Sequence, residues 1–189
     1  MSFKNLPRGF KSHSEKIALD FRDQLGLSYY SCLDARDLAK HLDVSVKTPF
    51  DFKLDENSLY NLTRNESGWS ALTIKINNRN LIIHNPTHSP VRQQTNIMHE
   101  LAHIICEHPM PKMIIISGMS LPLRYYDPKL EEEADWLSST LILPRKALYR
   151  CKKNNMSIQQ IANFYGVSQS LVRMRENLTG ISRQFSRDH

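Results

Sequence analysis

One segment, Arg92 to His108, constrains the fold of this chain more than any other. Around its middle and end the predicted helix is apolar almost all round, at Ile97, Met98, Leu101, Ala102, Ile104 and Ile105. Such a pattern is typical of a buried central helix and not of a surface one. Pro109 ends the segment. The same helix contains His99, Glu100 and His103, and such polar side chains are costly to bury unless they have partners. The chain is therefore expected to fold around a central helix that carries a polar site.

The spacing of the polar residues in this helix is that of a metal-binding motif. Four residues rotate an α-helix by roughly 400°, so His99 and His103 lie about 40° apart on one face and can reach one ion together. Glu100 lies beside that face, where its carboxylate can reach a water on the metal. Zinc lowers the pKa of such a water to about 7. The pattern predicts a zinc-dependent peptidase, with Zn²⁺ as cofactor and Glu100 as the catalytic base that later protonates the leaving amine.

A catalytic zinc needs a third protein ligand, and the helix itself does not supply one. The extended motif with three histidines requires Gly and His where this chain has Cys106 and Pro109. The alternative is a glutamate on a second helix, which gives a site of two histidines and one glutamate.

The acidic residues of the next predicted helix are the candidates for this ligand. Glu131 and Asp135 are one helical turn apart, so Glu131 can bind metal while Asp135 accepts a hydrogen bond from a ligand histidine. Glu133 is the competitor, because it also flanks the apolar stripe of the helix. A solvated acidic first turn is the ordinary alternative for each glutamate. Glu131 is the preferred third ligand.

Other polar residues near the motif have weaker claims on function. His84 precedes the metal helix and could line a cleft, and His108 follows the motif by one turn. For these two and for His88, a structural or surface role is favoured. Tyr125 and Tyr126 could donate a hydrogen bond to an oxyanion, but ordinary loop packing explains them equally well.

Periodicity and turn residues outline the other elements. Alternating apolar residues over 70–76, followed by 81–83 after an Asn-rich turn, predict a hairpin. Prolines and a glycine argue against regular structure over 109–128, a connection long enough to be functional, for example as a lid. The sequence leaves 51–68 unassigned. The remaining predictions are helices over 15–25, 34–42 and 127–142, an extended piece over 44–46 and an interrupted helical segment over 157–177.

Two separated motifs together resemble the ImmA/IrrE family of metallopeptidases. One is Trp69-Ser70-Ala71 with Asn85-Pro86, Arg92 and the sequence 99–103; the other is 131–135 running into Leu141-Ile142-Leu143-Pro144. The second resembles the family pattern ExEA(N/D)xFAxxLLxP, from which Leu137-Ser138 departs. The resemblance covers roughly residues 30 to 175. It implies a zinc site of His99, His103 and Glu131 with Glu100 catalytic, and a protein substrate such as a repressor-type regulator of phage, mobile-element or stress-response origin.

The resemblance and the periodicity together predict an α+β fold. It comprises a mostly helical zincin-like domain with a small antiparallel sheet, and a C-terminal helix-turn-helix-like segment. The predicted boundaries are a flexible tail over 1–14, a zinc metallopeptidase domain over 15–145 and the helical segment packed on it over 146–189.

The C-terminal segment has the pattern of a helix-turn-helix, with a turn at Gly166 and apolar residues where the two helices must touch. Arg173 and Arg175 near its end would suit DNA binding. A helical hairpin that packs on the catalytic domain is favoured over DNA binding. The alternative function is accordingly a DNA- or protein-binding regulator whose metal site is structural or vestigial.

The amino-acid composition is compatible with both a peptidase and a DNA- or protein-binding regulator, and it indicates the cellular compartment. The net charge of +6 permits nucleic acid or an acidic partner without requiring either. The three cysteines lie far apart and form no paired motif, which disfavours a disulfide framework and a cysteine zinc site. No apolar run approaches the length of a membrane span. A cytoplasmic location is therefore expected.

Overall fold

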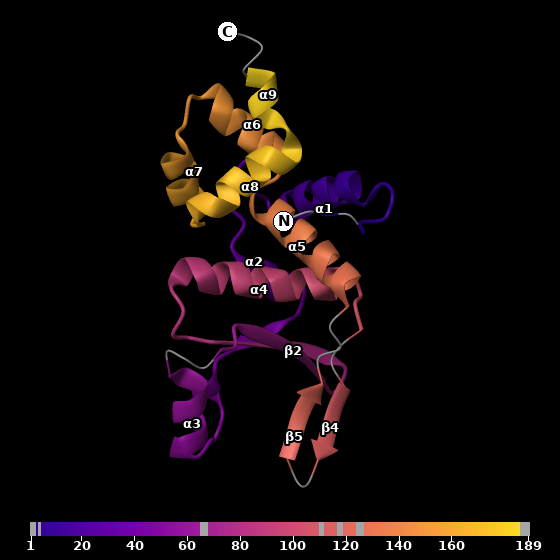
Figure 1. Ribbon diagram of the computed structural model, residues 1–189, viewed down its shortest axis with the longest axis vertical. Helices are drawn as coiled ribbons and strands as arrows, with labels where there is room; N and C mark the ends of the chain where they lie inside the picture. The colour runs from indigo at the N-terminus through magenta and orange to yellow at the C-terminus, as the bar shows by residue number, and fades with distance from the viewer. Residues whose placement is uncertain are drawn as a thin grey trace.

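The computed structural model describes residues 3, 5–64, 68–109, 112–116, 119–123 and 127–185. The molecule is elongated, with the C-terminal helices at one end and α3 and a β-hairpin at the other (Figure 1). Its helices are α1 (Phe10–Gln24), α2 (Ala35–His41), the 3-10 helix η1 (Pro49–Asp51), α3 (Glu56–Thr63), α4 (Pro90–Ile105), α5 (Pro128–Ile142), α6 (Arg145–Lys153), α7 (Ile158–Tyr165), α8 (Gln169–Thr179) and α9 (Ile181–Phe185). Its strands are β1 (Ser45–Lys47), β2 (Ala71–Ile76), β3 (Arg79–His84), β4 (Lys112–Ile116) and β5 (Met119–Leu123).

Helix α4 lies at the centre of the fold, as its apolar sequence predicts. It begins with Pro90 in its first turn and with the Ser89 side chain accepting a hydrogen bond from the backbone N–H of Arg92. Its apolar residues Ile97, Met98, Leu101 and Ala102 are fully buried. The helix packs against α5 on one side and against β2 and β3 on the other (Figure 1). The middle of α4, which contains Glu100, is therefore held between two packed layers.

The sheet under α4 has the strand order β1-β3-β2. Strands β2 and β3 form the predicted antiparallel hairpin, whose turn residues Asn77 and Asn78 both have positive φ angles, as a type I′ turn requires. The predicted α+β fold with a small sheet is confirmed, but strand β1 pairs with β3 in parallel, so the sheet is mixed and not simply antiparallel as predicted. Thr73 and Ile82 pair in register and both are buried, on the sheet face that packs on α4.

Two helices in the N-terminal part of the chain differ from the sequence prediction, one in its start and one in being absent from it. Helix α1 begins at Phe10, earlier than the expected start at residue 15, because a turn through Gly9 (φ 85°) already leads into it. Helix α3 lies in a region that the sequence left unassigned. Its N-cap Asp55 accepts a hydrogen bond from the backbone N–H of Ser58, and none of its residues is buried. With eight residues the helix is little more than two turns long, which is too short for apolar periodicity to distinguish it.

The proline-containing connection before α5 holds regular structure, contrary to the prediction for 109–128. Strands β4 and β5 form an antiparallel hairpin in which Met113 pairs with Pro122. A proline breaks a strand only where its missing N–H is needed, and in a two-stranded sheet each strand keeps an outer edge. The prolines therefore excluded a helix here but not a hairpin.

Two buried arginines bind the last turn of α5. Arg22 of α1 donates from Nη2 to the carbonyl oxygen of Ile142 at 3.1 Å, and Arg175 of α8 donates from Nε to that of Leu143 at 2.9 Å. Carbonyl groups at a helix C-terminus lack helical partners and form the negative end of the helix dipole. Both guanidinium groups are fully buried. Helices α1 and α8 are thus fastened to the same end of α5.

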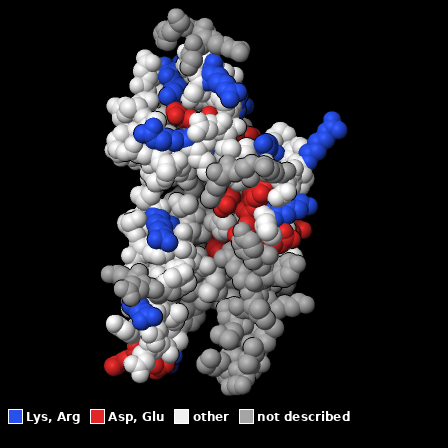
Figure 2. Space-filling view, viewed as in Figure 1, with Lys and Arg blue, Asp and Glu red and all other residues white. Residues whose placement is uncertain are grey.

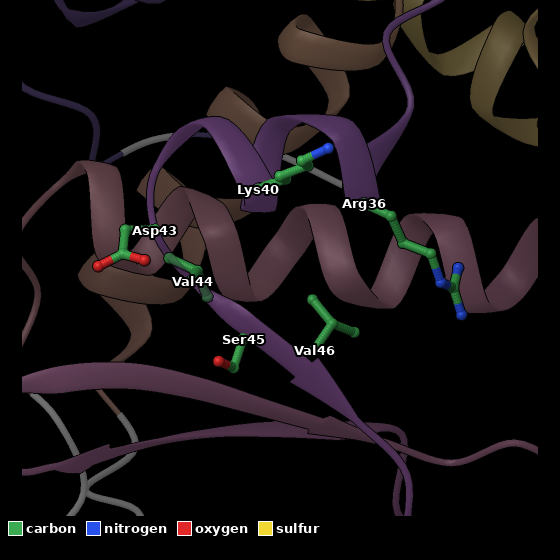
Figure 3. Close-up of a pocket in the computed structure, with 6 residues that line it drawn as sticks. All are labelled: Arg36, Lys40, Asp43, Val44, Ser45 and Val46. Carbon is green, nitrogen blue, oxygen red and sulfur yellow. The ribbon is translucent and has the colours of Figure 1, made fainter.

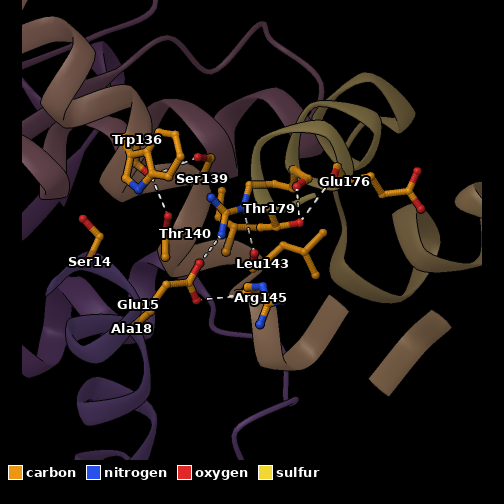
Figure 4. A network of polar contacts seen from close by, with 12 residues as sticks. Ser14, Glu15, Ala18, Trp136, Ser139, Thr140, Leu143, Arg145, Glu176 and Thr179 are labelled. Atoms are coloured by element: carbon orange, nitrogen blue, oxygen red, sulfur yellow. Dashed lines mark hydrogen bonds and ion pairs between the residues drawn. The ribbon is translucent and has the colours of Figure 1, made fainter. Parts of the chain in front are cut away.

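DNA binding by the C-terminal segment would require an exposed Arg175, but this residue is buried. Its Nη2 also pairs with Glu15 Oε1 at 2.6 Å, and Glu15 Oε2 accepts a hydrogen bond from the backbone N–H of Arg145 (Figure 4). Arg175 therefore lies inside the junction of α1, α5, α6 and α8 and cannot contact DNA. Arg173 of the same helix remains exposed. The division of the chain at 14 and 145 stays a prediction.

Among the helices within the described residues, none is both long and apolar enough to cross a lipid bilayer.

Candidate metal centre

His99, His103 and Glu131 come together where α4 and α5 pack against each other. The Nε2 atoms of the two histidines lie 3.1 Å apart. Glu131 Oε2 lies 3.3 Å from His99 Nε2, and Glu131 Oε1 lies 3.7 Å from His103 Nε2. Asp127 caps α5 by accepting a hydrogen bond from the backbone N–H of Lys129, which places Glu131 in the first turn of the helix. The structure thus brings together the three residues that the sequence predicts as ligands.

The three separations fit a zinc-sized cation. With zinc–nitrogen distances of about 2.0–2.1 Å, tetrahedral geometry separates two ligand atoms by about 3.3 Å. The three measured separations lie close to this value. The side chains of His99, His103 and Glu131 are 21%, 13% and 19% exposed, so the donors are held by packing and remain accessible. Two imidazoles and one carboxylate are also the donor set of catalytic zinc sites that keep a position open for water or substrate.

Asp135 stands behind His99, as the one-turn spacing from Glu131 predicts. Its Oδ1 lies 3.0 Å from His99 Nδ1. Burial by itself lowers the pKa of His99, but hydrogen bonds to Asp135 and Glu131 outweigh burial and raise that pKa to about 9. Without a bound cation, His99 would therefore be protonated at both ring nitrogens at neutral pH. A cation at Nε2 would take the place of one of these protons.

His103 has a different arrangement behind it, which the sequence reasoning did not foresee. His103 Nδ1 lies 2.8 Å from His108 Nδ1, and His108 Nε2 lies 3.2 Å from Glu133 Oε2. Burial lowers the pKa of His108 below its ordinary value, although the hydrogen bond to Glu133 opposes this shift. Glu133, the competing candidate for third ligand, thus contacts His108. For His108 we predicted a structural or surface role, and this prediction did not include the contact with His103.

Glu100 is held from the sheet beneath α4. Thr73 of β2 donates from Oγ1 to Glu100 Oε2 at 2.6 Å, and both residues are buried. A hydrogen bond to a carboxylate is commonly this short. Thr73 contacts only Oε2 of Glu100 and not Oε1. The hairpin was predicted, but nothing in the sequence showed that Thr73 would face Glu100 instead of solvent.

The remaining predicted residues lie apart from the cluster or outside the described part of the chain. His84 is buried at the end of β3, where its Nε2 contacts Arg36 Nη2 at 3.1 Å. Burial, and then the charge of Arg36, lower its pKa. His88 Nδ1 pairs with Asn96. Tyr125 and Tyr126, the possible oxyanion donors, lie outside the described residues.

An open pocket lies on another part of the molecule, between α2 and β1 (Figure 3). It is lined by Arg36, Lys40, Asp43, Val44, Ser45 and Val46. None of these residues belongs to the cluster of His99, His103 and Glu131. The two basic side chains, Arg36 and Lys40, come from α2. The pocket is therefore lined by residues other than His99, Glu100 and His103.

Acidic side chains gather over α5, while basic side chains lie over the C-terminal helices (Figure 2). The acidic residues of α5 are Glu131, Glu132, Glu133 and Asp135. Glu132 accepts hydrogen bonds from the backbone and side chain of Asn5, so it points away from the cluster. Negative charge in this part of the molecule favours the binding of a cation between α4 and α5.

A comparison with known protein families matches residues 52–177 to the IrrE N-terminal-like domain, Peptidase_M78. The match covers two thirds of the chain and includes both α4 and α5. The chain belongs to this family. A comparison with curated proteins finds no match. As a member of the M78 metallopeptidases, the protein acts on protein substrates. The matched range continues through α7 into α8, so the M78 domain includes the helix-turn-helix-like segment together with the His-His-Glu cluster.

Proposed function

We propose that this M78 peptidase is a zinc-dependent endopeptidase that cleaves a regulatory protein. The observation that carries this proposal is the placement of Glu100 on the same helix as two histidines that converge with Glu131. The resemblance to ImmA/IrrE peptidases supports a helix-turn-helix transcriptional repressor of a phage, mobile element or stress response as the substrate. The three free cysteines are consistent with a reducing cytoplasm, which would also contain such a substrate.

In the proposed mechanism, His99, His103 and Glu131 would hold the zinc ion. When bound, zinc polarises a substrate carbonyl and lowers the pKa of a water molecule to about 7. Glu100 accepts the proton of the attacking water and then donates it to the nitrogen of the leaving amine. Thr73 holds one oxygen of the Glu100 carboxylate, so the carboxylate keeps one orientation through both proton transfers. Asp135 contacts Nδ1 of His99 and His108 contacts Nδ1 of His103, so each ring is held at the nitrogen that faces away from the zinc position.

The proposed function is tested by identifying a cleaved protein. The chain would be co-expressed with each regulator that is encoded beside it, and mass spectrometry would search for two complementary fragments of one regulator. Fragments are expected with the wild-type chain and not with a Glu100→Gln variant. Intact regulators throughout, together with sequence-specific DNA binding that His99→Ala leaves unchanged, would instead support the alternative of a regulator with a vestigial site. The burial of Arg175 already removes one of the two arginines on which DNA binding would depend.

Zinc content tests the ligand set directly. Purified wild-type protein is expected to contain about one zinc ion per chain, as the three converging donors predict. Glu131→Gln removes a charged ligand and should weaken zinc binding by about 100-fold or more, because loss of an outer hydrogen-bond partner alone costs 10- to 100-fold. Titration against a competing chelator measures this change. Glu132→Gln, the neighbouring exchange, should retain wild-type affinity; a Glu131→Gln chain that does the same would exclude Glu131 as the ligand.

Replacement of Thr73 by valine tests how Glu100 is oriented. Valine keeps the shape of the side chain but removes the hydroxyl donor, and a hydrogen bond to a charged group contributes about 1.5 kcal/mol, so kcat should fall about tenfold. Zinc content should not change, since Thr73 contacts none of the three ligands in the described hydrogen bonds. Thr95→Val is the control, because its hydroxyl bonds only to a carbonyl within α4. Equal kcat for Thr73→Val and wild type would contradict the assigned role.

A further inference from the structure

A chain of two hydrogen bonds leads away from His103 on the side opposite the cluster. It runs from His103 Nδ1 to His108 Nδ1 over 2.8 Å, and from His108 Nε2 to Glu133 Oε2 over 3.2 Å. The side chains of His108 and Glu133 are only 5% and 12% exposed. Polar groups buried to this degree are normally held there by specific partners. Each of the two finds its partner in this chain.

The backbone at the end of α4 explains how His108 reaches His103. Glu107 has a φ of 55°, and the backbone N–H groups of Glu107 and His108 donate to the carbonyl oxygens of Ile104 and His103. This pattern is a Schellman motif, which turns the chain back over the last turn of the helix. His108 is thereby placed beside His103, with the two ring centroids 4.9 Å apart. The motif normally has glycine at the position of Glu107, so the chain accepts an unfavourable residue at this turn.

The chemistry of the three groups fixes the direction of the hydrogen bonds. A carboxylate only accepts, so His108 Nε2 carries the hydrogen that Glu133 receives. A neutral imidazole has one N–H, which leaves His108 Nδ1 as an acceptor. His103 Nδ1 must then be the donor. With its hydrogen on Nδ1, neutral His103 has a free electron pair on Nε2, the atom that faces His99 and Glu131.

We propose that His108 and Glu133 are a positioning pair that holds His103 in the orientation and tautomer able to bind the metal ion. The inference rests on the proposed function, because it assumes a cation at the cluster. Asp135 alone accepts the hydrogen bond from Nδ1 of His99. For His103, the same role is divided between His108, which accepts the hydrogen bond, and Glu133, which fixes the hydrogen on His108. A histidine ligand generally donates its other N–H to a carboxylate, carbonyl or water, and loss of that acceptor weakens metal binding. Neither residue would touch the metal or the substrate.

The test compares two variants at His108 by their binding of zinc alone and of cobalt alone. His108→Leu fills the space without an acceptor and should weaken zinc binding about 10- to 100-fold in a chelator competition. His108→Asn offers an amide oxygen close to the former Nδ1 and should recover a measurable part of this loss. The visible absorption of the Co²⁺-loaded protein should change in His108→Leu and return toward wild type in His108→Asn. His84→Leu, which removes another buried histidine, should leave zinc affinity and the Co²⁺ spectrum unchanged.

The outcomes separate this inference from the proposed function. A wild-type chain that takes up no zinc would overturn both. A wild-type chain that binds zinc, with His108→Leu binding equally well or His108→Asn no better than His108→Leu, would overturn the positioning pair alone. If His108→Leu fails to fold, Glu133→Gln carries the test, because a neutral amide no longer enforces a hydrogen on His108 Nε2. It should also lower zinc affinity and change the Co²⁺ spectrum; wild-type values for both would contradict the proposal.

Discussion

Replacing Glu100 by glutamine is expected to abolish cleavage while zinc stays bound. Glutamine keeps the size of the side chain and can still accept the hydrogen bond from Thr73, but it cannot accept a proton from water. Loss of a general acid–base group costs about 10²- to 10⁴-fold in rate. The three metal-binding side chains are untouched, so zinc content should remain about one ion per chain. Initial rates on the cleaved regulator, with zinc analysis of the same samples, measure both quantities.

A matched control for this exchange lies at the end of the same helix. Glu107 is exposed, and Glu107→Gln removes an identical charge without affecting the cluster. Its cleavage rate and zinc content should equal those of the wild type. Full proteolytic activity in the Glu100→Gln variant would contradict the proposed mechanism. Loss of zinc together with activity would show that Glu100 stabilises the site and would leave its role as a base without support.

Replacing Arg175 by methionine is expected to lower the free energy of unfolding by about 3 kcal/mol, the low end of the cost of removing one partner from a buried ion pair. Methionine fills much of the space, but it leaves the carbonyl of Leu143 and one oxygen of Glu15 without their donor. The low end is appropriate because the side chain of Glu15 is 24% exposed and water can partly replace the lost contact. Urea denaturation with an unchanged slope measures the difference.

Arg173 offers the control for this variant, since it has the same charge and lies on the exposed face of α8. Arg173→Met should change the free energy of unfolding by less than about 0.5 kcal/mol, as surface exchanges usually do. A double-mutant cycle with Glu15→Gln isolates the energy of the pair from that of the Leu143 contact. If Arg175→Met is as stable as Arg173→Met, the C-terminal helices are not fastened to α5 in the way that the contacts indicate.

The stability of this junction affects the candidate metal cluster because Glu131 and Asp135 both lie on α5. Arg22 and Arg175 fix the far end of that helix, and α4 packs along it. The C-terminal helices are therefore part of the scaffold that positions the helix with the candidate ligand Glu131. This is consistent with the family match, which extends from residue 52 through the cluster into α8.

Several features could be predicted because they depend on residues close together in the sequence. The apolar character of α4 predicted its central position, and the Asn-rich turn predicted the β2–β3 hairpin. The pairing of β1 with β3 in parallel could not be predicted, since three extended residues do not show which strand they will join. The β4–β5 hairpin was missed because its prolines were interpreted without knowing which strand edges would stay unpaired.

The candidate site also has a part that the local sequence predicts and a part that depends on the packing of helices. His99, Glu100 and His103 share one helix, and helical periodicity alone places them on adjoining faces. Glu131 and Glu133 flank the apolar stripe of α5 from its two sides, so periodicity permits either one to approach the histidines. The packing of α5 on α4 decides this, because it places Glu131 against both histidines and Glu133 against His108. That Glu131 binds the metal stays a prediction.

The sequence by itself determined that this chain has a buried helix with two histidines one turn apart and a glutamate between them in the sequence, because the spacing within a helix is a local property. Only the tertiary structure decided what supports them. Thr73 reaches Glu100 from the sheet, His108 returns to His103 through a turn without glycine, and Arg175 enters the interior and not a DNA-binding surface. Each of these contacts joins separately formed elements or depends on a turn that the sequence does not reveal, so it exists only once the chain has packed.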